Sequence, residues 1–395
     1  MKRFHDVTVA PTEYLRNSTG RLPREASGGI YRGGPVFPRF AIQVAARHRR
    51  GWLGLPRDAR PRITGPVEAQ AEIGLWCGPV SPHYGHMIAD FGMRIATASR
   101  FDRTTPLVFS AGPAAMGPPP AFFWGLVEHF GVDRGRICLI ERPTLFRTLL
   151  VPPQAERLDG PPPSRAHLDV MDEIVATNGP VPQDLETLFV SRARWPDGRL
   201  AGEPYVAEVL ERAGVAVIQP EMLPVSEQVR MLRRARRILF SEGSALHTLQ
   251  LLGRLHARVA VIARRPKAPL ARAALAARVE DLAYWQPSRG ILYGLNRRGR
   301  PRPDRALVLF DEADLVEKLR LLAPDIAEHW DGAAYAARLS ADVAQWIALN
   351  AYSNDHPDLL PFIRRQLARL GLTVDVDGAW EIGRTMWRSA MPRSA

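Results

Sequence analysis

Two histidines, an aspartate and an arginine recur at helical intervals in the stretch SPHYGHMIADFGMRI. In a helix that opens at its Ser-Pro pair, His83, His86 and Asp90 would share one face, and Arg94 would continue that face one turn on. A histidine one turn before an aspartate suits a general base whose ring is oriented by the carboxylate. Two histidines and one acid on one helix make a poor tetrahedral metal set. The same spacing is also typical of a solvated helix face with one hydrogen-bonded histidine.

A second polar group, Ser191, Arg192 and Arg194, lies in LFVSRARWPDGRLAGE directly after a predicted strand. In parallel α/β sheets, ligands bind outside the carboxyl ends of the strands. A hydroxyl and two guanidinium groups at such an end suit phosphate oxygens, which arginine can bind with two parallel hydrogen bonds. An ordinary polar surface loop would give the same pattern.

The third segment, ILFSEGSALHTLQLLG, is a predicted strand followed by a small-residue turn and a predicted helix. Gly243 would permit a sharp turn, and Ser244 would be the N-cap. The first amides of the helix, at Ser244, Ala245 and the next residue, would form an anion site flanked by Glu242 and His247. This arrangement suits a nucleotide phosphate or a ribose, although it is neither a GxGxxG motif nor a P-loop. A plain strand-to-helix turn is the alternative.

The elements that must position these groups alternate along the chain. Strands are predicted at 72–77, 106–110, 137–140, 144–151, 188–191, 215–218, 238–241 and 258–263. Helices are predicted at 82–100, 121–130, 164–178, 203–213, 226–236 (capped by Ser226) and 244–252. This alternation is typical of βαβ units and parallel sheets.

The Pro-rich segment 180–182 is the best internal boundary. We expect an irregular segment at 1–66, a first Rossmann-like domain at 67–181 and a second one at 182–324, with a cleft between the two domains. Residues 325–395 are expected to be a helical extension with one short strand, LTVDV; a partner-binding module is the alternative for this region.

Composition limits the remaining choices. The chain has 395 residues and a formal net charge of +12, which attracts anions in general. Because the arginine pairs are scattered, a basic surface spread over the whole protein explains the charge equally simply. Two cysteines cannot form a disulfide framework, and no apolar run approaches the ~18–20 residues of a membrane span. The N-terminus lacks the apolar core of a signal peptide, so we expect a cytoplasmic protein whose basic surface permits loose contact with the inner face of a membrane.

The three polar segments, in this order, resemble glycosyltransferase family 61. HYGHMIAD (83–90) is similar to the family's N-x-x-H-W/F-L/F-x-D/E motif, with His83 in the place of Asn, and FVSR (189–192) to its I-S-R segment. PVSEQV (224–229) resembles its S-x-x-E-Q-V stretch, and SEGSALHT (241–248) its G-x-H-G-A-G-L-x-N motif. In the last motif, Glu242 replaces the common His.

The resemblance implies a GT-B fold and an inverting transferase, of the bacterial polysaccharide type, that needs neither a metal nor a cofactor. It would move a hexosyl or pentosyl group from a nucleotide-sugar to a glycan, lipid-linked or protein acceptor. His86, oriented by Asp90, would be the base, with Glu242 as its rival; His83 and Arg94 would lie on the acceptor side. Donor binding is expected from the residues of the other two segments: Ser191, Arg192, Arg194, Gly243, Ser244, Ala245 and His247.

Proteins of other classes fit the sequence less well. A nucleic-acid-binding protein would explain the charge, but no helix-turn-helix or zinc signature is visible. A non-catalytic scaffold of polysaccharide assembly, which binds a sugar nucleotide without turnover, would keep the fold. A sugar-nucleotide epimerase would carry GxGxxG and YxxxK motifs together, and this combination is absent.

Overall fold

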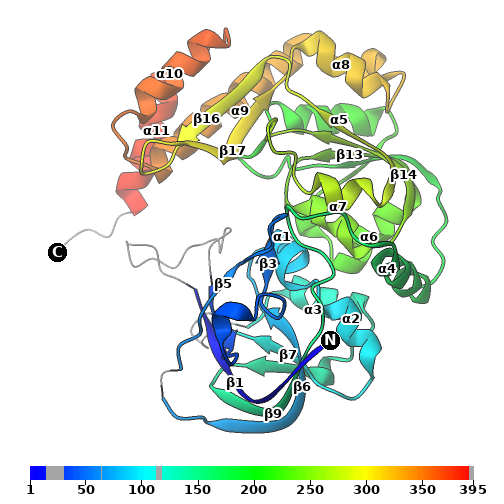
Figure 1. The fold of residues 1–395 in the computed structure, drawn as a ribbon. Helices are drawn as coiled ribbons and strands as arrows, with labels where there is room; N and C mark the ends of the chain where they lie inside the picture. The colour runs from blue at the N-terminus through cyan, green and yellow to red at the C-terminus, as the bar shows by residue number, and fades with distance from the viewer. Residues whose placement is uncertain (15–30, 64, 113–117, 391–395) are drawn as a thin grey trace.

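The structure, a computed structural model of the chain, describes residues 1–14, 31–63, 65–112 and 118–390. Its architecture is mixed α/β, with two main sheets that contain parallel strands and are flanked by helices. Figure 1 shows the first sheet in the lower half of the molecule and the second in the upper half. The alternation of apolar runs and helical patterns therefore predicted the fold class.

The first sheet has seven strands in the order β5-β2-β1-β9-β6-β7-β8. They are β5 (Asp58–Ala59), β2 (Tyr31–Pro35), β1 (Lys2–Tyr14), β9 (Thr144–Val151), β6 (Ala69–Pro79), β7 (Leu107–Ser110) and β8 (Ile137–Ile140). Neighbours from β9 to β8 are parallel, whereas β1 is antiparallel to both β2 and β9.

The expectation of an irregular segment at 1–66 was wrong for its described residues. The first part of strand β1 pairs with β9, from Lys2 opposite Val151 to Val9 opposite Thr144. Alternating burial of Val7 and Val9 is the strand signal in this segment, but the polar and charged residues that precede the valines obscure it. Residues 15–30 and 64 lie outside the described part of the chain.

The second sheet has five parallel strands in the order β12-β10-β13-β14-β15. Their bounds are β12 (Ala216–Ile218), β10 (Leu185–Val190), β13 (Ala235–Ser241), β14 (Leu255–Ile262) and β15 (Val279–Trp285). A third sheet, β11-β17-β16, pairs β11 (Arg199–Leu200) with the hairpin formed by β16 (Gly290–Leu295) and β17 (Pro301–Leu309). Helices cover both faces of the second sheet, and loops follow its strands at the carboxyl edge (Figure 1).

Helices complete the layers: α2 (Ile95–Phe101), α3 (Ala121–His129), α4 (Arg165–Thr177), α5 (Glu203–Arg212), α6 (Val225–Arg234), α7 (Arg272–Ala276) and α8 (Glu312–Arg320). Gly131 and Gly214, just past α3 and α5, have φ of 65° and 76°, as a left-handed C-terminal position requires. Ser226 does not cap α6, because this helix starts one residue earlier and Pro224 occupies the N-cap position. Proline there fixes the entry of the chain but supplies no capping oxygen.

The C-terminal region contains α9 (Gly332–Ser353), α10 (Leu359–Arg369) and α11 (Val376–Ala390), which pack around the third sheet (Figure 1). The expected strand LTVDV does not form: its first residues have no regular structure and its last opens α11. A lone apolar run without a neighbouring strand edge cannot satisfy its backbone hydrogen bonds as a strand.

The two halves share one hydrophobic core. Leu75, Phe109 and Phe123 of the first half belong to the same buried cluster as Ile238 and Val259 of the second. Helix α4 precedes the Pro-rich segment but is tied to the second half, since Arg254 pairs with Asp169 at 2.8 Å and with Asp172. The halves are therefore connected by a packed hydrophobic contact as well as by the linker.

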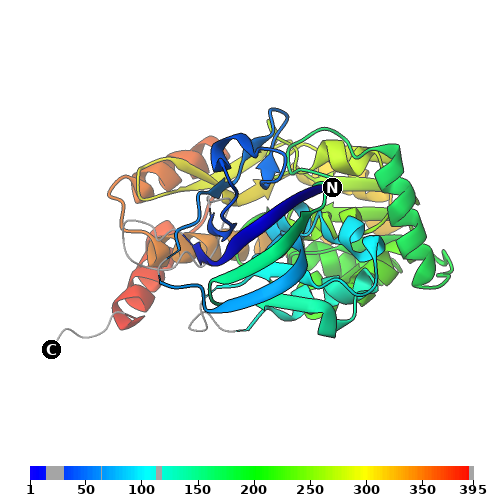
Figure 2. The ribbon, with the colours of Figure 1, turned by 60° about the horizontal axis from the view of Figure 1, so that its bottom comes forward.

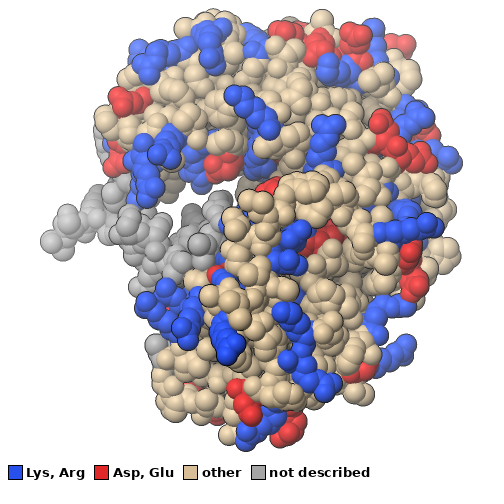
Figure 3. Space-filling model, in the orientation of Figure 1, with Lys and Arg blue, Asp and Glu red and all other residues tan. Residues whose placement is uncertain are grey.

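Two further expectations can be compared with the structure. Both cysteines are free thiols, with Cys77 buried and Cys138 half-buried. Across the described ranges, none of the helices combines the length and apolar character needed to cross a membrane. On the face drawn in Figure 3, lysine and arginine side chains are spread over both halves and are not gathered in one patch.

Candidate functional site

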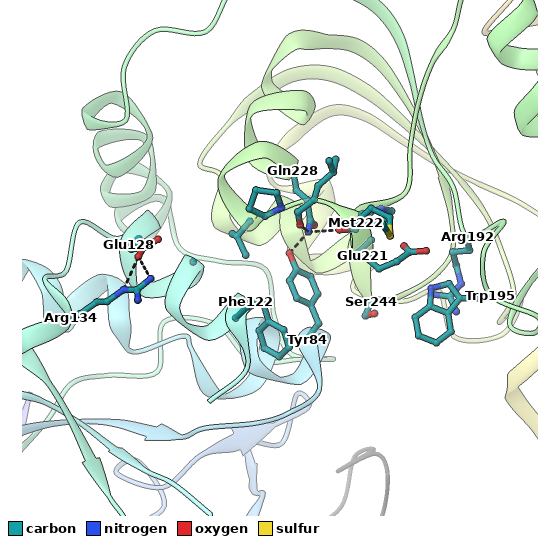
Figure 4. A pocket seen from close by; sticks show the side chains of 17 residues that line it. Tyr84, Phe122, Glu128, Arg134, Arg192, Trp195, Glu221, Met222, Gln228 and Ser244 are labelled. Atoms are coloured by element: carbon teal, nitrogen blue, oxygen red, sulfur yellow. Dashed lines mark hydrogen bonds and ion pairs between the residues drawn. The ribbon is translucent and has the colours of Figure 1, made fainter. Parts of the chain in front are cut away.

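A cavity of about 610 Å³ lies where the carboxyl edge of the second sheet meets the first half. The loops that follow β10, β12 and β13 form one wall, with Arg192, Glu221 and Ser244 among their side chains (Figure 4). The other wall comes from the first half, with Tyr84 and Phe122. Ligands of parallel α/β sheets bind at this edge because helix starts and loop side chains converge there.

Arg192 lies across the turn that follows β13. A Cβ atom on Gly243 would stand 2.5 Å from Nη1 of Arg192 and 2.9 Å from its Cδ. Gly243 itself is extended, with φ of −172°, so its role is to leave room for the arginine and not to supply a left-handed turn. Nε of Arg192 donates to the Gly198 carbonyl at 2.8 Å, and the guanidinium lies 5.6 Å from the ring centre of Trp195. Burial lowers the pKa of Arg192.

The two polar neighbours of Arg192 have other positions. Ser191 is fully buried and donates its hydroxyl to Glu203 at 3.0 Å, so this side chain does not reach the cavity. Glu203, the first residue of α5, also accepts from Ser241 at 2.8 Å and thereby ties the ends of β10 and β13 together. Arg194 is exposed and does not line the cavity. Of the expected arginine pair, only Arg192 is placed to contact a bound ligand.

The turn after β13 continues into η6 (Ser244–Leu251), a 3-10 helix that we expected to be an α-helix. Gly243 is its N-cap residue, so the expected capping by Ser244 was wrong. Ser244 and Ala245 instead line the cavity. The amides at a helix start point along its axis, and a ligand in the cavity faces this end of η6.

Glu242 is buried beneath the turn. Its carboxylate accepts from the Arg265 backbone amide at 3.0 Å, from the Arg265 guanidinium at 3.0 Å and from the Arg264 backbone amide. It therefore holds the loop after β14, the next strand along the sheet. A carboxylate with these contacts is well suited to position the loop.

Three arginines come together at this edge, and only Arg192 was anticipated from the sequence. Burial, together with the positive charges of Arg265 and Arg192, lowers the pKa of Arg264 to about 9. The buried Nε atom of Arg264 has no hydrogen-bond partner within the described structure. Like charges held near one another in a buried setting favour the binding of an anion.

The first half contributes a broken helix in place of the expected continuous one. Helix α1 (Tyr84–His86) begins at His83, whose ring accepts from the His86 amide at 3.3 Å, so the expected N-cap at Ser81 was wrong. A π-helical turn, η2 (Met87–Phe91), follows and ends at Gly92. Such turns rotate the side chains that follow them and are often found at functional sites.

His86 and Asp90 form the expected pair on this helix. Nδ1 of His86 lies 2.9 Å from Oδ2 of Asp90, whose side chain is 2% exposed. The other carboxylate oxygen, Oδ1, is buried and has no hydrogen-bond partner among the described residues. Neither residue lines the 610 Å³ cavity, whereas Tyr84, two residues before His86 in the chain, does.

Arg94 does not continue this polar face. The π-helical turn shifts it inward, where it is fully buried and donates to the carbonyls of Ala46 and Arg47, both at 3.1 Å, and of Pro152. These bonds fasten the N-terminal segment to the first sheet. The expected acceptor-side role of Arg94 is therefore contradicted by its position.

His83 and His247 complete a group of imidazoles between the halves. The ring centres of His83 and His86 are 4.6 Å apart, and Nδ1 of His247 donates to Oε1 of Gln250 at 2.7 Å. Burial lowers the pKa of His83 to about 4, with smaller contributions from His86 and His247. Burial also lowers the pKa of His247 to about 4. Both rings are therefore neutral near pH 7.

The joint between the halves uses residues that the sequence did not single out. The Tyr84 hydroxyl donates to Gln228 at 3.1 Å (Figure 4). It also lies 2.7 Å from the Thr248 hydroxyl, which donates to Gln228 as well. Gly85 allows this contact, because a Cβ atom there would stand 2.9 Å from both Ser244 and His247. The sequence signal that could have indicated these contact residues is the position of Tyr84 and Gly85 between the two candidate histidines, His83 and His86.

The arrangement can bind an anion and move a proton. Arg192 and the start of η6 line the cavity, and the His86-Asp90 pair lies on the helix that begins next to Tyr84, another lining residue. In the described ranges, no group of three or more His, Cys, Asp or Glu side chains is placed to hold a metal ion.

Comparison with known proteins supports a family for part of the chain. No curated protein matches the chain significantly. The family model described as Glycosyltransferase 61 matches residues 84–254, which contain all the candidate site residues except His83 and cover less than half of the chain. This match supports an assignment of the site-bearing segment to glycosyltransferase family 61.

Proposed function

We propose that this protein is an inverting glycosyltransferase that uses a nucleotide-sugar donor, with a GT-B-type arrangement of its halves. The observation that carries the proposal is the cavity itself: Arg192 and the start of η6 meet there at the carboxyl edge of a parallel sheet. The family match over residues 84–254 supports transfer of a sugar as the reaction class.

The donor fits the cavity by its charge and shape. Arg192 and the amides at Ser244 and Ala245 would hold the diphosphate, with the positive charge of Arg264 behind them. The apolar side of the cavity, which includes Phe122 and Met222, suits a nucleobase. In the transition state, negative charge grows on the leaving diphosphate, and a preorganised guanidinium there stabilises it.

The base comes from the other half of the molecule. In the proposed step, the acceptor hydroxyl oxygen attacks the anomeric carbon while the bond from that carbon to the diphosphate breaks. The hydroxyl proton passes to Nε2 of His86, and Asp90 keeps the proton of His86 on Nδ1. The unpartnered Oδ1 of Asp90 would accept a bond from a bound substrate or water.

Glu242 is assigned a positioning role. Its carboxylate is occupied by the loop after β14, so it would shape the diphosphate end of the cavity through Arg264 and Arg265. His83 would lie beside the acceptor, and His247 would support the contact between the halves. Arg94 and Ser191 would act on the fold alone.

Isothermal titration with a panel of nucleotide sugars tests donor binding, and the chain offers a matched pair of variants. Arg192→Ala should weaken binding by roughly tenfold to a hundredfold, because a charge-assisted hydrogen bond contributes about 1.5–3 kcal/mol. Arg194→Ala, two residues away and exposed, should leave binding unchanged. No binding by any nucleotide sugar, or equal losses in both variants, would count against the proposal.

A further inference from the structure

A short hairpin in the first half presents apolar side chains to solvent. Its strands are β3 (Arg49–Arg50) and β4 (Leu55–Pro56), which pair antiparallel. The side chains at its end are strongly exposed: Trp52 by 67%, Leu53 by 88% and Leu55 by 65%. In Figure 2 the blue segment that contains this hairpin stands out at the upper edge of the molecule.

The exposed hairpin is held firmly. The backbone of Arg49 exchanges two hydrogen bonds with the Gln154 side chain, of 2.8 and 3.0 Å, and the Gly51 amide donates to the Leu158 carbonyl at 2.9 Å. Gly51 and Gly54 have φ of 72° and 66°, as the tight turn between the strands requires. The apolar end is therefore preorganised, which lowers the entropic cost of docking.

Positive charge gathers at the same end. Arg157 Nη1 lies 2.6 Å, and Arg49 Nη1 3.6 Å, from the point where a Cβ atom on Gly54 would stand. In the described part of the chain, neither guanidinium has a carboxylate ion pair, in contrast to Arg50, which pairs with Asp159 at 3.0 Å. The buried Nε of Arg49 has no partner there either. Two like charges held side by side repel each other, and an anion bound between or beside them would reduce this repulsion.

A cavity of about 570 Å³ adjoins the hairpin end. Its walls include Trp52, Arg157 and Arg272, the last from α7. The cavity thus offers two guanidinium groups, of Arg157 and Arg272, to an anionic headgroup, while the one carboxylate in its lining, Asp159, is paired with Arg50.

We propose that the hairpin 49–56 docks on an anionic phospholipid bilayer. Tryptophan favours the bilayer interface, leucines enter the acyl boundary, and arginines bind lipid phosphates at that depth. A protein partner or a second copy fits less well, since three side chains on a narrow hairpin offer much less area than the ~800 Å² per partner of a stable protein interface.

Docking has a consequence for the site, which rests on the proposed function. Nε2 of Gln154 donates to the Arg49 carbonyl and also, at 3.4 Å, to the Asp90 carbonyl. The hairpin is thus joined through one side chain to the backbone of the proposed catalytic pair. A bilayer at the hairpin would place a membrane-borne acceptor beside His86.

Vesicle flotation tests the docking without any turnover measurement. The full chain should float with phosphatidylcholine vesicles that contain phosphatidylglycerol, and should float less with phosphatidylcholine alone or at high salt. The double variant Trp52→Ser/Leu53→Ser should bind at least about tenfold more weakly, because two buried apolar side chains are lost. Arg157→Gln should weaken binding to the anionic vesicles only.

Matched controls lie elsewhere on the surface. Leu321→Ser, at a leucine that is 64% exposed after α8, and Arg297→Gln, in the exposed turn before β17, should bind as the unchanged protein does. Failure to bind the anionic vesicles, or equal binding by the hairpin double variant, would overturn the proposal. So would a dimer in solution that dissociates in the double variant, since the hairpin would then face a second copy. None of these results bears on nucleotide-sugar binding, which the titration above tests separately.

Discussion

At the residue scale, the His86-Asp90 pair is the most direct target for measurement. His86→Gln should lower turnover by about 10²–10⁴-fold while nucleotide-sugar binding stays within the range of the unchanged protein, because a general base acts on the acceptor hydroxyl and not on donor affinity. Asp90→Asn should cause a smaller loss, since the imidazole remains but its orientation is weakened. Release of nucleoside diphosphate from the donor, followed in both variants, provides the measurement; unchanged release in His86→Gln would remove this residue from the mechanism.

The two neutral histidines predict a pH-dependent stability. Their pKa values are depressed to about 4 in the folded protein, below the usual ~6.5 of an unfolded chain. Between these values the unfolded state binds more protons, so stability is full above about pH 6.5 and falls as the pH drops toward 4.

Urea unfolding at a series of pH values checks this expectation. Each histidine should contribute a loss of up to roughly 3 kcal/mol across that window. His247→Gln should flatten the slope between pH 6.5 and 4, whereas a variant of the exposed His256 should not. An equally steep slope in His247→Gln would show that other groups cause it.

Also at the residue scale, an experiment can distinguish two roles for Glu242, positioning of a loop and catalysis as the base. If it positions the loop after β14, Glu242→Gln should lower the free energy of unfolding by about 1–3 kcal/mol, because the ion pair with Arg265 is lost and the bonds to two backbone amides weaken. Thermal unfolding measures this change. A variant with unchanged stability and no turnover would instead identify Glu242 as the base.

At the element scale, the contact of α1 with η6 depends on a missing side chain. Gly85→Ala should push Ser244 and His247 away and destabilise the protein by about 1–3 kcal/mol, with a loss of donor affinity because Ser244 lines the cavity. Gly332→Ala is the matched control, since its new Cβ would meet only the carboxylate end of Glu312, a long side chain that can shift more easily than backbone. Equal stability of the two variants, measured by urea unfolding, would mean that the halves can separate freely at this point.

The elements also show which local signals were reliable. Short apolar runs such as Leu107–Ser110 and Ile137–Ile140 were confirmed as strands. The first is buried along its whole length and the second, at the sheet edge, is largely half-buried, so neither needs alternation to be recognised. Helix starts were less reliable. Ser81, Ser226 and Ser244 each have the residue type of an N-cap, yet His83, Pro224 and Gly243 occupy those positions. Tertiary contacts set where a helix begins when several residues could start it.

At the scale of the whole molecule, the shared core predicts cooperative unfolding. Apolar side chains of both halves pack in one cluster, and Tyr84, Gln228 and Thr248 join them by hydrogen bonds. Calorimetry should therefore show the two halves unfolding in a single transition. Tyr84→Phe should lower the free energy of unfolding by about 1 kcal/mol and leave the transition single. Two well-separated transitions in the unchanged protein would contradict a shared core.

The sequence by itself determined the alternation of elements, the parallel second sheet and the three polar segments of the site. These depend on local apolar periodicity and on residue type near a strand end, both of which are written in short stretches. The pair of His86 with Asp90 was recognisable because both lie in one such stretch, and Arg192 and Gly243 were each recognisable as site candidates near a strand end.

Only the tertiary structure decided what those polar residues touch. Glu203 accepts a hydrogen bond from the Ser191 hydroxyl, and Arg265 donates to the Glu242 carboxylate. A π-helical turn places Arg94 away from its expected face. Each of these contacts joins elements that are distant or irregular, so no local pattern could specify it. A polar side chain near a predicted site has several partners within reach, and the folded packing selects the one that satisfies its buried atoms.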